Sequence, residues 1–321
     1  MAVIISRFAP APTGFLHLGH VVNAIYVWGV TRARDGRVLL RIEDHDRARS
    51  RSAFEEAILE DLAWLGFRSD GPLVRQSERR DIYLQALGAL RRQGLIYACA
   101  CSRAEISNIA RRGRDAGPER PALQPFVDSE ELRYPGTCRD RGLAEGPDVG
   151  LRVRLDPSTE RFVDLGHGLQ EQRPSEQCGD LLARDRDGNW TYQFAAAVDD
   201  DVQGVTLVIR GDDLLPSTGR QMQLARLLGR VEPPEFLHHP LIMKSQTHPS
   251  PNARDVRSHV EGQKLSKSDQ DTGVRDLRAL GWSADRVIGR AAWLAGLIPQ
   301  PRDVHADEVS SIMGAFGKAP S

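Results

Sequence analysis

The feature that most constrains this chain is an apolar segment near the N-terminus that runs into a Pro/Gly-rich turn and two histidines. Residues 2–8 (AVIISRF) are rich in β-branched and apolar side chains and predict a buried strand. Residues 9–14 (APAPTG) stiffen the backbone and then turn it. Residues 17–35 have a helical composition. A strand that turns into a helix directs backbone N–H groups and the positive end of the helix dipole at one spot, so the sequence predicts an anion site there.

The two histidines stand at the start of the predicted helix. His17 and His20 are three residues apart and therefore share one face, and Gly19 between them lets a bulky group approach the backbone. Two imidazole donors beside a helix N-terminus suit the phosphates of a nucleotide. A metal site is an alternative, but no glutamate follows His17 as in H-E-x-x-H. The other alternative is one helix-capping histidine and one packed histidine.

A second signature lies far downstream, where Lys264 and Lys267 stand in the sequence KLSKS at residues 264–268. Two ammonium groups in a small, polar segment predict a mobile clamp that closes on a polyphosphate and then releases the product. The alternative is an ordinary solvated surface segment, which is common for lysine–serine tracts.

Together and in this order, about 245 residues apart, the two motifs resemble the HIGH and KMSKS signatures of class I aminoacyl-tRNA synthetases. Four further blocks are similar to the glutamyl branch of that class, and the resemblance covers most of residues 3–270. It implies an α/β fold: a Rossmann-type catalytic domain with an inserted zinc-containing subdomain and a short helical C-terminal region. The blocks are RFAP with PTG at residues 7–14, RIED at 41–44, VDD at 198–200 and VIRGDDL at 208–214.

Length and composition agree with such an enzyme. The 321 residues are enough for two domains, and 40% hydrophobic and 27% charged residues are ordinary for a globular protein. The sequence has no apolar run of transmembrane length and no signal peptide, so we expect a cytoplasmic protein with no membrane contact, and a monomer. With a net charge of −1, any RNA surface must be a local patch. The arginines of residues 103–120 are one candidate, and a solvated loop is the alternative.

The order of the predicted elements divides the chain into four parts. Alternating strands and helices over residues 1–95 indicate the first half of the Rossmann domain, with a parallel sheet. Residues 96–185 break the alternation and read as the inserted subdomain. Residues 186–245 form the second half, and residues 246–321 hold the lysine segment and the helical C-terminal region. We expect strands at 37–43 and 205–210, a strand pair at 149–155 and 161–165, a loop at 245–263, and helices at 52–65 (with a capping box at its start), 77–93, 218–228, 274–280 and 284–295.

Three cysteines of the inserted region form a candidate metal site. Cys99 and Cys101 are close enough in sequence to face one tetrahedral ion, and Cys138 adds a third thiolate. Tyr134 is a less common fourth ligand, and the alternative is three buried thiols beside a surface tyrosine. The pattern C-x-C followed by Tyr-x-x-x-Cys is similar to the zinc site of the short glutamyl-Q tRNA(Asp) synthetases, which implies one structural Zn²⁺ per chain. Cys178 fits no pattern and reads as a core thiol.

A glutamate pocket needs a guanidinium for the side-chain carboxylate and an acid for the ammonium. Arg7, Glu43 and Arg210 end predicted strands, where open α/β sheets bind ligands, and an ordinary ion pair is the alternative for each. The resemblance implies a glutamate site formed by Arg7, Phe8, Ala9, Pro10, Ala11, Glu43, Tyr192 and Arg210. Ala11 replaces a frequent serine, and Ala196 replaces the asparagine of full-length glutamyl enzymes.

The resemblance implies that the protein activates L-glutamate with ATP and Mg²⁺ and passes it to tRNA. His17, Gly19, His20, Lys264 and Lys267 are the implied ATP-binding residues, and His17, His20 and Lys267 the catalytic ones. About 50 residues follow the lysine segment, too few for an anticodon-binding domain, which favours the short family whose acceptor is the queuosine base of tRNA(Asp). The alternatives are a minimal synthetase that charges the 3′ end of tRNA(Glu), a non-catalytic zinc protein that binds RNA, and a nucleotidyltransferase for another acid.

Overall fold

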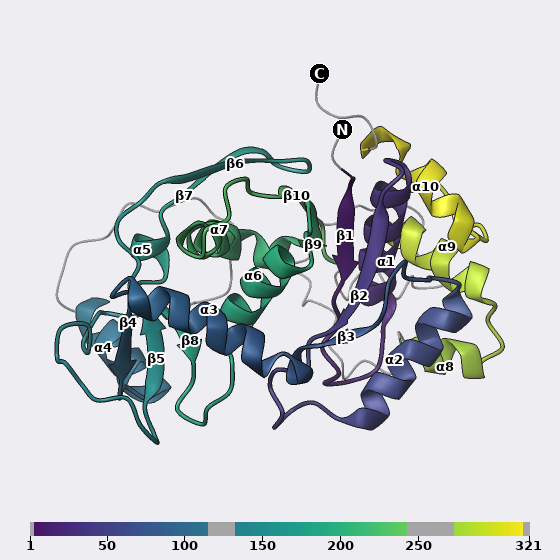
Figure 1. Cartoon of the computed structure of the whole chain (residues 1–321). Coiled ribbons are helices and arrows are strands. Elements are labelled where there is room, and N and C mark those ends of the chain that lie inside the picture. The colour runs from purple at the N-terminus through teal and green to yellow at the C-terminus, as the bar shows by residue number, and fades with distance from the viewer. Residues whose placement is uncertain (1–2, 115–131, 243–272, 317–321) are drawn as a thin grey trace.

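The computed structural model describes residues 3–114, 132–242 and 273–316, without the side chains of 110–114 and 315. Figure 1 shows a three-stranded parallel sheet with helices on one side of the molecule and a three-stranded antiparallel sheet on the other, with a third sheet next to the parallel one. None of the helices in the described ranges is long and apolar enough to cross a membrane.

The first sheet is parallel, as the alternating pattern predicts, and has the order β1-β2-β3. Helix α2 covers the range expected from the sequence and ends at Gly66, whose φ of 86° suits glycine. The expected capping box at its start is wrong, because Arg51 is the N-cap residue and Ser52 is already helical. The elements are β1 (Ile5–Phe8), α1 (Leu18–Arg32), β2 (Arg37–Ile42), α2 (Ser52–Leu65) and β3 (Val74–Arg75).

The middle of the chain forms an antiparallel sheet with the order β4-β5-β8. The expected strand pair at 149–155 and 161–165 is wrong, because β5 pairs with β4 and β8 and is buried at every position. The alternating strand β6 instead forms a hairpin with β7. The elements are η1 (Gln76–Glu78), α3 (Arg80–Arg92), β4 (Ile96–Cys99), α4 (Arg103–Arg114), β5 (Gly150–Val153), β6 (Glu160–Asp164), β7 (Gly168–Gln172), α5 (Pro174–Gln177) and β8 (Leu181–Arg184).

A third sheet, with the order β7-β6-β10-β9, lies next to the first one. The amide of Thr206, just before β9, donates to the carbonyl of Ile5 in β1 at 2.9 Å, so the ends of β1 and β9 are neighbours. This brings the C-terminal ends of strands from both halves of the chain to one place. The elements are α6 (Tyr192–Val202), β9 (Leu207–Gly211), η2 (Asp212–Ser217), α7 (Thr218–Leu227) and β10 (Glu235–His239).

The C-terminal helices pack on α1, which they bury together with the first sheet (Figure 1). Gly29 of α1 permits this close packing, because a Cβ there would lie 2.5 Å from Cγ of Met313. The elements are α8 (Val274–Ala279), α9 (Ala284–Leu294), η5 (Ala306–Glu308), α10 (Val309–Ile312) and η6 (Gly314–Phe316).

Candidate functional site

The two histidines form a cap at the N-terminus of α1. The amide of Gly19 donates to Nδ1 of His17, and the amide of His17 donates to Nδ1 of His20, each at 3.1 Å. Because Nδ1 of each ring accepts a hydrogen bond, Nε2 carries the proton and is a donor. The ring centroids lie 4.0 Å apart. Gly19 makes the arrangement possible, since a Cβ there would lie 2.9 Å from Cε1 of His17. The two histidines therefore cap the helix and also lie on one face of it, so two interpretations that the sequence leaves open are both compatible with the structure.

The start of α8 lies beside this histidine cap. Gly273 forms a β-bridge with His17, and the amide of Val274 donates to the carbonyl of Leu16 at 2.9 Å. Gly273 is the first described residue after the segment that contains KLSKS. Lys264, Lys267 and the expected loop at 245–263 lie outside the described residues, as do Arg120 and the side chains of the other expected arginines of α4 except Arg103, which is exposed.

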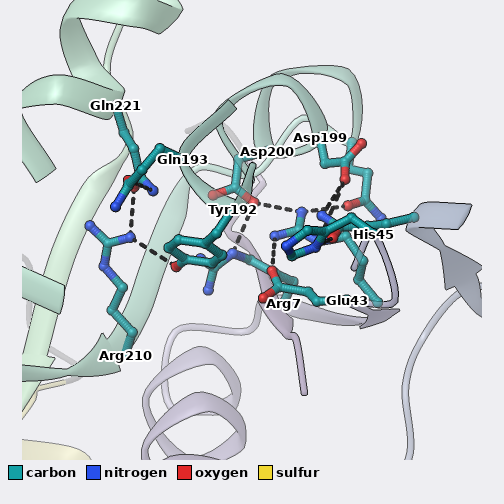
Figure 2. A network of polar contacts seen from close by, with 12 residues as sticks. Arg7, Glu43, His45, Tyr192, Gln193, Asp199, Asp200, Arg210 and Gln221 are labelled. Atoms are coloured by element: carbon teal, nitrogen blue, oxygen red, sulfur yellow. Dashed lines mark hydrogen bonds and ion pairs between the residues drawn. The ribbon is translucent and has the colours of Figure 1, made fainter. Parts of the chain in front are cut away.

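Two strand-end residues of the expected glutamate site, Arg7 and Glu43, lie in one buried polar network (Figure 2). Nε of Arg7 donates to Asp200 Oδ1 at 2.9 Å. Arg41 donates to the same oxygen at 2.7 Å and to Glu43 Oε1 at 3.1 Å. Arg41 therefore bridges two carboxylates. One is Asp200, which also accepts from Arg7, and the other is Glu43.

Burial and ion pairing have opposite effects on the ionisation of this network. Burial alone would raise the pKa of Asp200. The guanidinium groups of Arg7 and Arg41 have the larger combined effect and lower it to about 2. Burial also lowers the pKa of Arg41, but the carboxylates of Asp200, Glu43 and Asp199 raise it overall. Asp200 therefore stays ionised at neutral pH and holds Arg7 in one orientation.

Arg210 has a different set of partners. Its guanidinium donates to Oε1 of Gln221 at 2.6 Å, to Oγ1 of Thr218 at 2.8 Å and to Nε2 of His238 at 3.0 Å. The hydroxyl of Tyr192 lies 3.5 Å from NH1. In the ranges that the structure covers, no carboxylate is ion-paired with this guanidinium.

A buried cation held only by neutral acceptors needs an anion. Only 4% of Arg210 is exposed, and burial lowers its pKa. Figure 2 shows the ring of Tyr192 between Arg210 and the network of Arg7 and Asp200. The arrangement therefore fits a ligand that brings its own carboxylate to Arg210.

The other residues expected in the glutamate site, Phe8 to Ala11, lie at the end of β1 and in the turn that follows it. The side chain of Phe8 is buried against Trp28, with ring centroids 5.3 Å apart. The carbonyl of Pro10 accepts from the amide of Glu43 at 3.0 Å, and the carbonyl of Ala11 accepts from Thr13 at 2.8 Å. These bonds, with half-buried Ala9 next to Phe8, fix the turn between β1 and α1.

Three cysteine sulfurs come together between β4 and the segment after residue 132. The Sγ atoms of Cys99, Cys101 and Cys138 lie within 4.8 Å of one another. Sγ of Cys101 is 3.5 Å from Sγ of Cys138, too far for a disulfide. The hydroxyl of Tyr134 lies 3.4 Å from Sγ of Cys99 and accepts from the amide of Cys138 at 2.8 Å. Cys178 stands apart, as expected, with its thiol directed at the carbonyl of Pro174.

The chemistry of this cluster suits a soft divalent cation. Burial and the neighbouring thiols raise the pKa of Cys101 to about 11, and burial also raises the pKa of Tyr134. Hydrogen bonds, first from the amide of Ala100, outweigh burial and lower the pKa of Cys138. A zinc ion would offset the charge of three thiolates, and their mutual distances are compatible with tetrahedral ligation.

Several polar residues of the site are not evident from the sequence. Thr218, Gln221 and His238 contact Arg210, although they come from α7 and β10. Asp199 accepts from Tyr83, at 2.8 Å, and from two other side chains. One signal is visible in the sequence, since the apolar strand around residue 236 ends in two histidines, the kind of position where a parallel sheet places ligand-binding residues.

Comparisons with known proteins agree with this geometry. The catalytic-domain family of class I tRNA synthetases (E and Q) matches residues 3–287. A glutamyl-Q tRNA(Asp) synthetase of Symbiobacterium thermophilum is 38% identical over 96% of this chain and 91% of that relative. A protein of the same name from Rhodobacter capsulatus is 40% identical over 89% of this chain and 100% of its own length.

A solved structure extends the likeness to the fold. The crystal structure of a glutamate tRNA ligase from Elizabethkingia meningosepticum, in complex with its amino acid, is 27% identical with a TM-score of 0.72. The match covers 96% of this chain but 64% of that ligase, so this chain spans less than two thirds of its length. The chain belongs to the class I tRNA synthetases of the glutamyl and glutaminyl type, among the relatives named glutamyl-Q tRNA(Asp) synthetase.

Proposed function

We propose that the protein activates L-glutamate with ATP and transfers the glutamyl group to tRNA(Asp). The observation that carries the proposal is the cluster of side chains at the strand ends. Among the described residues, buried Arg210 has neutral hydrogen-bond partners only, and Glu43 supplies a carboxylate. A dicarboxylic amino acid supplies the complementary charges. The names of the relatives, which this chain matches over 91% and 100% of their lengths, support the same substrate and acceptor.

In this proposal each end of glutamate has a partner. Arg210, with the hydroxyl of Tyr192 beside it, binds the side-chain carboxylate, and Glu43 binds the α-ammonium. Arg7, held by Asp200, and the backbone of residues 8–11 complete the proposed site. Because the residues are pre-oriented by buried hydrogen bonds, little reorganisation is needed when the substrate enters.

The adenylate-forming step needs electrostatic help more than covalent chemistry. An oxygen of the α-carboxylate attacks the α-phosphorus of ATP, the bond to the bridging oxygen breaks, and pyrophosphate leaves. His17 and His20 donate from Nε2 to the phosphates above Gly19 and the N-terminus of α1. Lys264 and Lys267 stabilise the leaving pyrophosphate, and Mg²⁺ offsets part of its charge. Gly273 pairs with His17, and a six-residue segment such as that from Lys267 to Gly273 spans at most roughly 20 Å.

The cysteine cluster has a structural role in this proposal. Cys99, Cys101, Cys138 and Tyr134 hold one Zn²⁺ that pins the inserted subdomain, which we place at residues 96–185. The subdomain separates the catalytic halves at 1–95 and 186–245, and residues 246–321 form the C-terminal region. We propose that the chain works as a monomer.

The acceptor of the glutamyl group is one modified base of the tRNA in this proposal. We propose the queuosine base at the wobble position of tRNA(Asp), because the relatives are named for tRNA(Asp). The test is transfer of labelled glutamate to three RNAs: tRNA(Asp) with queuosine, tRNA(Asp) without it, and tRNA(Glu). We expect label on the first alone. Label on tRNA(Glu) that is abolished when the 3′-terminal diol of the RNA is oxidised with periodate before the reaction would instead identify a minimal glutamyl-tRNA synthetase.

A further inference from the structure

Three neighbouring strands place an aspartate, a histidine and an arginine in one row. Strand β10 lies between β6 and β9, and His238 is in register with Arg210. Nδ1 of His238 lies 2.6 Å from Oδ2 of Asp164, and its Nε2 lies 3.0 Å from Nε of Arg210. Asp164 and His238 are each 1% exposed, and neither takes part in the reaction as proposed above.

The hydrogen-bond pattern determines which nitrogen of His238 carries the proton. A guanidinium has donors and no acceptor, so Nε2 must present its lone pair to Arg210. The proton is then on Nδ1, where the carboxylate of Asp164 accepts it. Thr218 fits the same pattern, because its hydroxyl lies 3.2 Å from Nε2 and accepts from Arg210 at 2.8 Å.

The imidazole also stays neutral at neutral pH. Burial lowers the pKa of His238 to about 4, with Arg210 acting in the same direction, against the opposing effect of Asp164. A neutral ring between Asp164 and Arg210 keeps the carboxylate out of direct contact with the guanidinium. The carboxylate therefore orients the ring, while the positive charge of Arg210 remains available to a ligand.

We infer that Asp164 and His238 are positioning residues that set the preference for an acidic amino acid at Arg210. By fixing the imidazole with its proton on Nδ1, they aim the guanidinium at the side-chain carboxylate of the substrate without neutralising it. The inference rests on the proposed function, since it assumes that glutamate binds at Arg210. It predicts that the pair affects binding of the amino acid and leaves binding of ATP unchanged.

Two substitutions at His238 of nearly equal shape separate this role from simple packing. His238→Met removes the acceptor, and His238→Gln keeps one near the position of Nε2. In glutamate-dependent ATP–pyrophosphate exchange, we expect His238→Met to raise the KM for glutamate about tenfold or more, with the KM for ATP unchanged. His238→Gln should restore part of the affinity, with a KM at least about threefold below that of His238→Met.

Asp164→Asn tests the tautomer. The side-chain amide can donate to Nδ1, which favours the proton on Nε2, where it opposes Arg210. We expect a rise in the KM for glutamate similar to that of His238→Met, and a weaker discrimination against glutamine. Thermal melting of each variant shows whether it is folded.

The tautomer of His238 can also be measured directly in the wild-type protein. ¹⁵N chemical shifts of histidine-labelled wild-type protein, assigned through the signal missing in His238→Gln, should show a proton on Nδ1. A proton on Nε2 overturns the inference, as does a folded His238→Met variant with a KM for glutamate equal to that of the wild type. If the wild type itself shows no glutamate-dependent exchange, the proposed function fails instead.

Discussion

At the scale of single residues, the site depends on how each buried charge is paired. Arg41 and Arg7 share the carboxylate of Asp200, whereas Arg210 is held by neutral acceptors. The sequence predicts Arg7, Glu43 and Arg210 because each ends an apolar strand. It does not predict His238 or Thr218 as partners of Arg210, since these contacts depend on the order of strands in the sheet and on the position of α7.

The geometry of Arg210 makes a conservative substitution costly. Arg210→Lys keeps the charge but replaces a planar fork with a single ammonium that cannot satisfy Gln221, Thr218 and His238 together. We expect the KM for glutamate to rise roughly 100-fold. Arg161→Lys, at an exposed position of β6, is the control and should have little effect. An unchanged KM in Arg210→Lys contradicts this account of the pocket.

Asp61 predicts an unusual pH dependence of stability. It is fully buried on α2, and neither oxygen has a hydrogen-bond partner among the described residues. Nε of Arg275 lies 3.5 Å from Oδ1, but the effect of burial is larger and raises the pKa from 3.8 to about 6. The unfolded chain therefore loses this proton first as pH rises from about 4 to 6, so stability falls through that window, by up to roughly 3 kcal/mol. Urea unfolding between pH 4 and 7.5 measures the effect. Asp61→Asn should lack this fall in the free energy of unfolding. The same pH dependence in both proteins would contradict the prediction.

At the scale of elements, local pattern and tertiary pairing differ in how far the sequence predicts them. The range 52–65 has its own helical period and a terminal glycine, and the structure has a helix over the same residues. Residues 149–155 and 161–165 both look like strands, but nothing in either segment tells which strands they join. The hairpin of β6 with β7 and the burial of β5 between β4 and β8 decide the pairing.

The cap of α1 predicts a loss of activity without a loss of stability. In Gly19→Ala the new methyl group would displace the ring of His17 and break its hydrogen bond to the helix. The lost cap costs about 1 kcal/mol, which the better helix propensity of alanine offsets. We expect the melting temperature to change little while kcat/KM for ATP falls about tenfold. The control is Gly146→Ala, where a Cβ meets nothing within 4 Å. A drop in melting temperature with normal kinetics would contradict this role.

At the scale of the whole molecule, three sheets bring together residues that are nearly 200 positions apart, such as Arg7 and Asp200. The family motifs make this architecture predictable from the sequence, because each motif implies its neighbours in a known fold. The lysine pair lies outside the described residues, so its proximity to His17 stays a prediction. The cysteine cluster is a clearer case, since spacing alone favours three buried thiols over a metal site, and the structure brings the three sulfurs together.

Removal of metal should destabilise one region of the molecule. We expect one equivalent of zinc per purified chain, and a strong chelator should lower the melting temperature and increase hydrogen exchange in β4 and β5 more than in β1 and β2. Cys101→Ser should reproduce the effect. Cys178→Ser, which alters a thiol outside the cluster, should retain the zinc. Full zinc content in Cys101→Ser would exclude the proposed ligand set.

We propose above all that the residues around Arg210 and Glu43 bind glutamate for activation beside the histidine cap. The most direct measurement is ATP–pyrophosphate exchange by the purified, zinc-replete protein in the absence of tRNA. The account predicts exchange that requires glutamate, is not supported by glutamine or aspartate, and is lost in Lys267→Ala although this variant remains folded. A folded, zinc-replete protein that shows no exchange with glutamate, or that exchanges equally with glutamine, would contradict it.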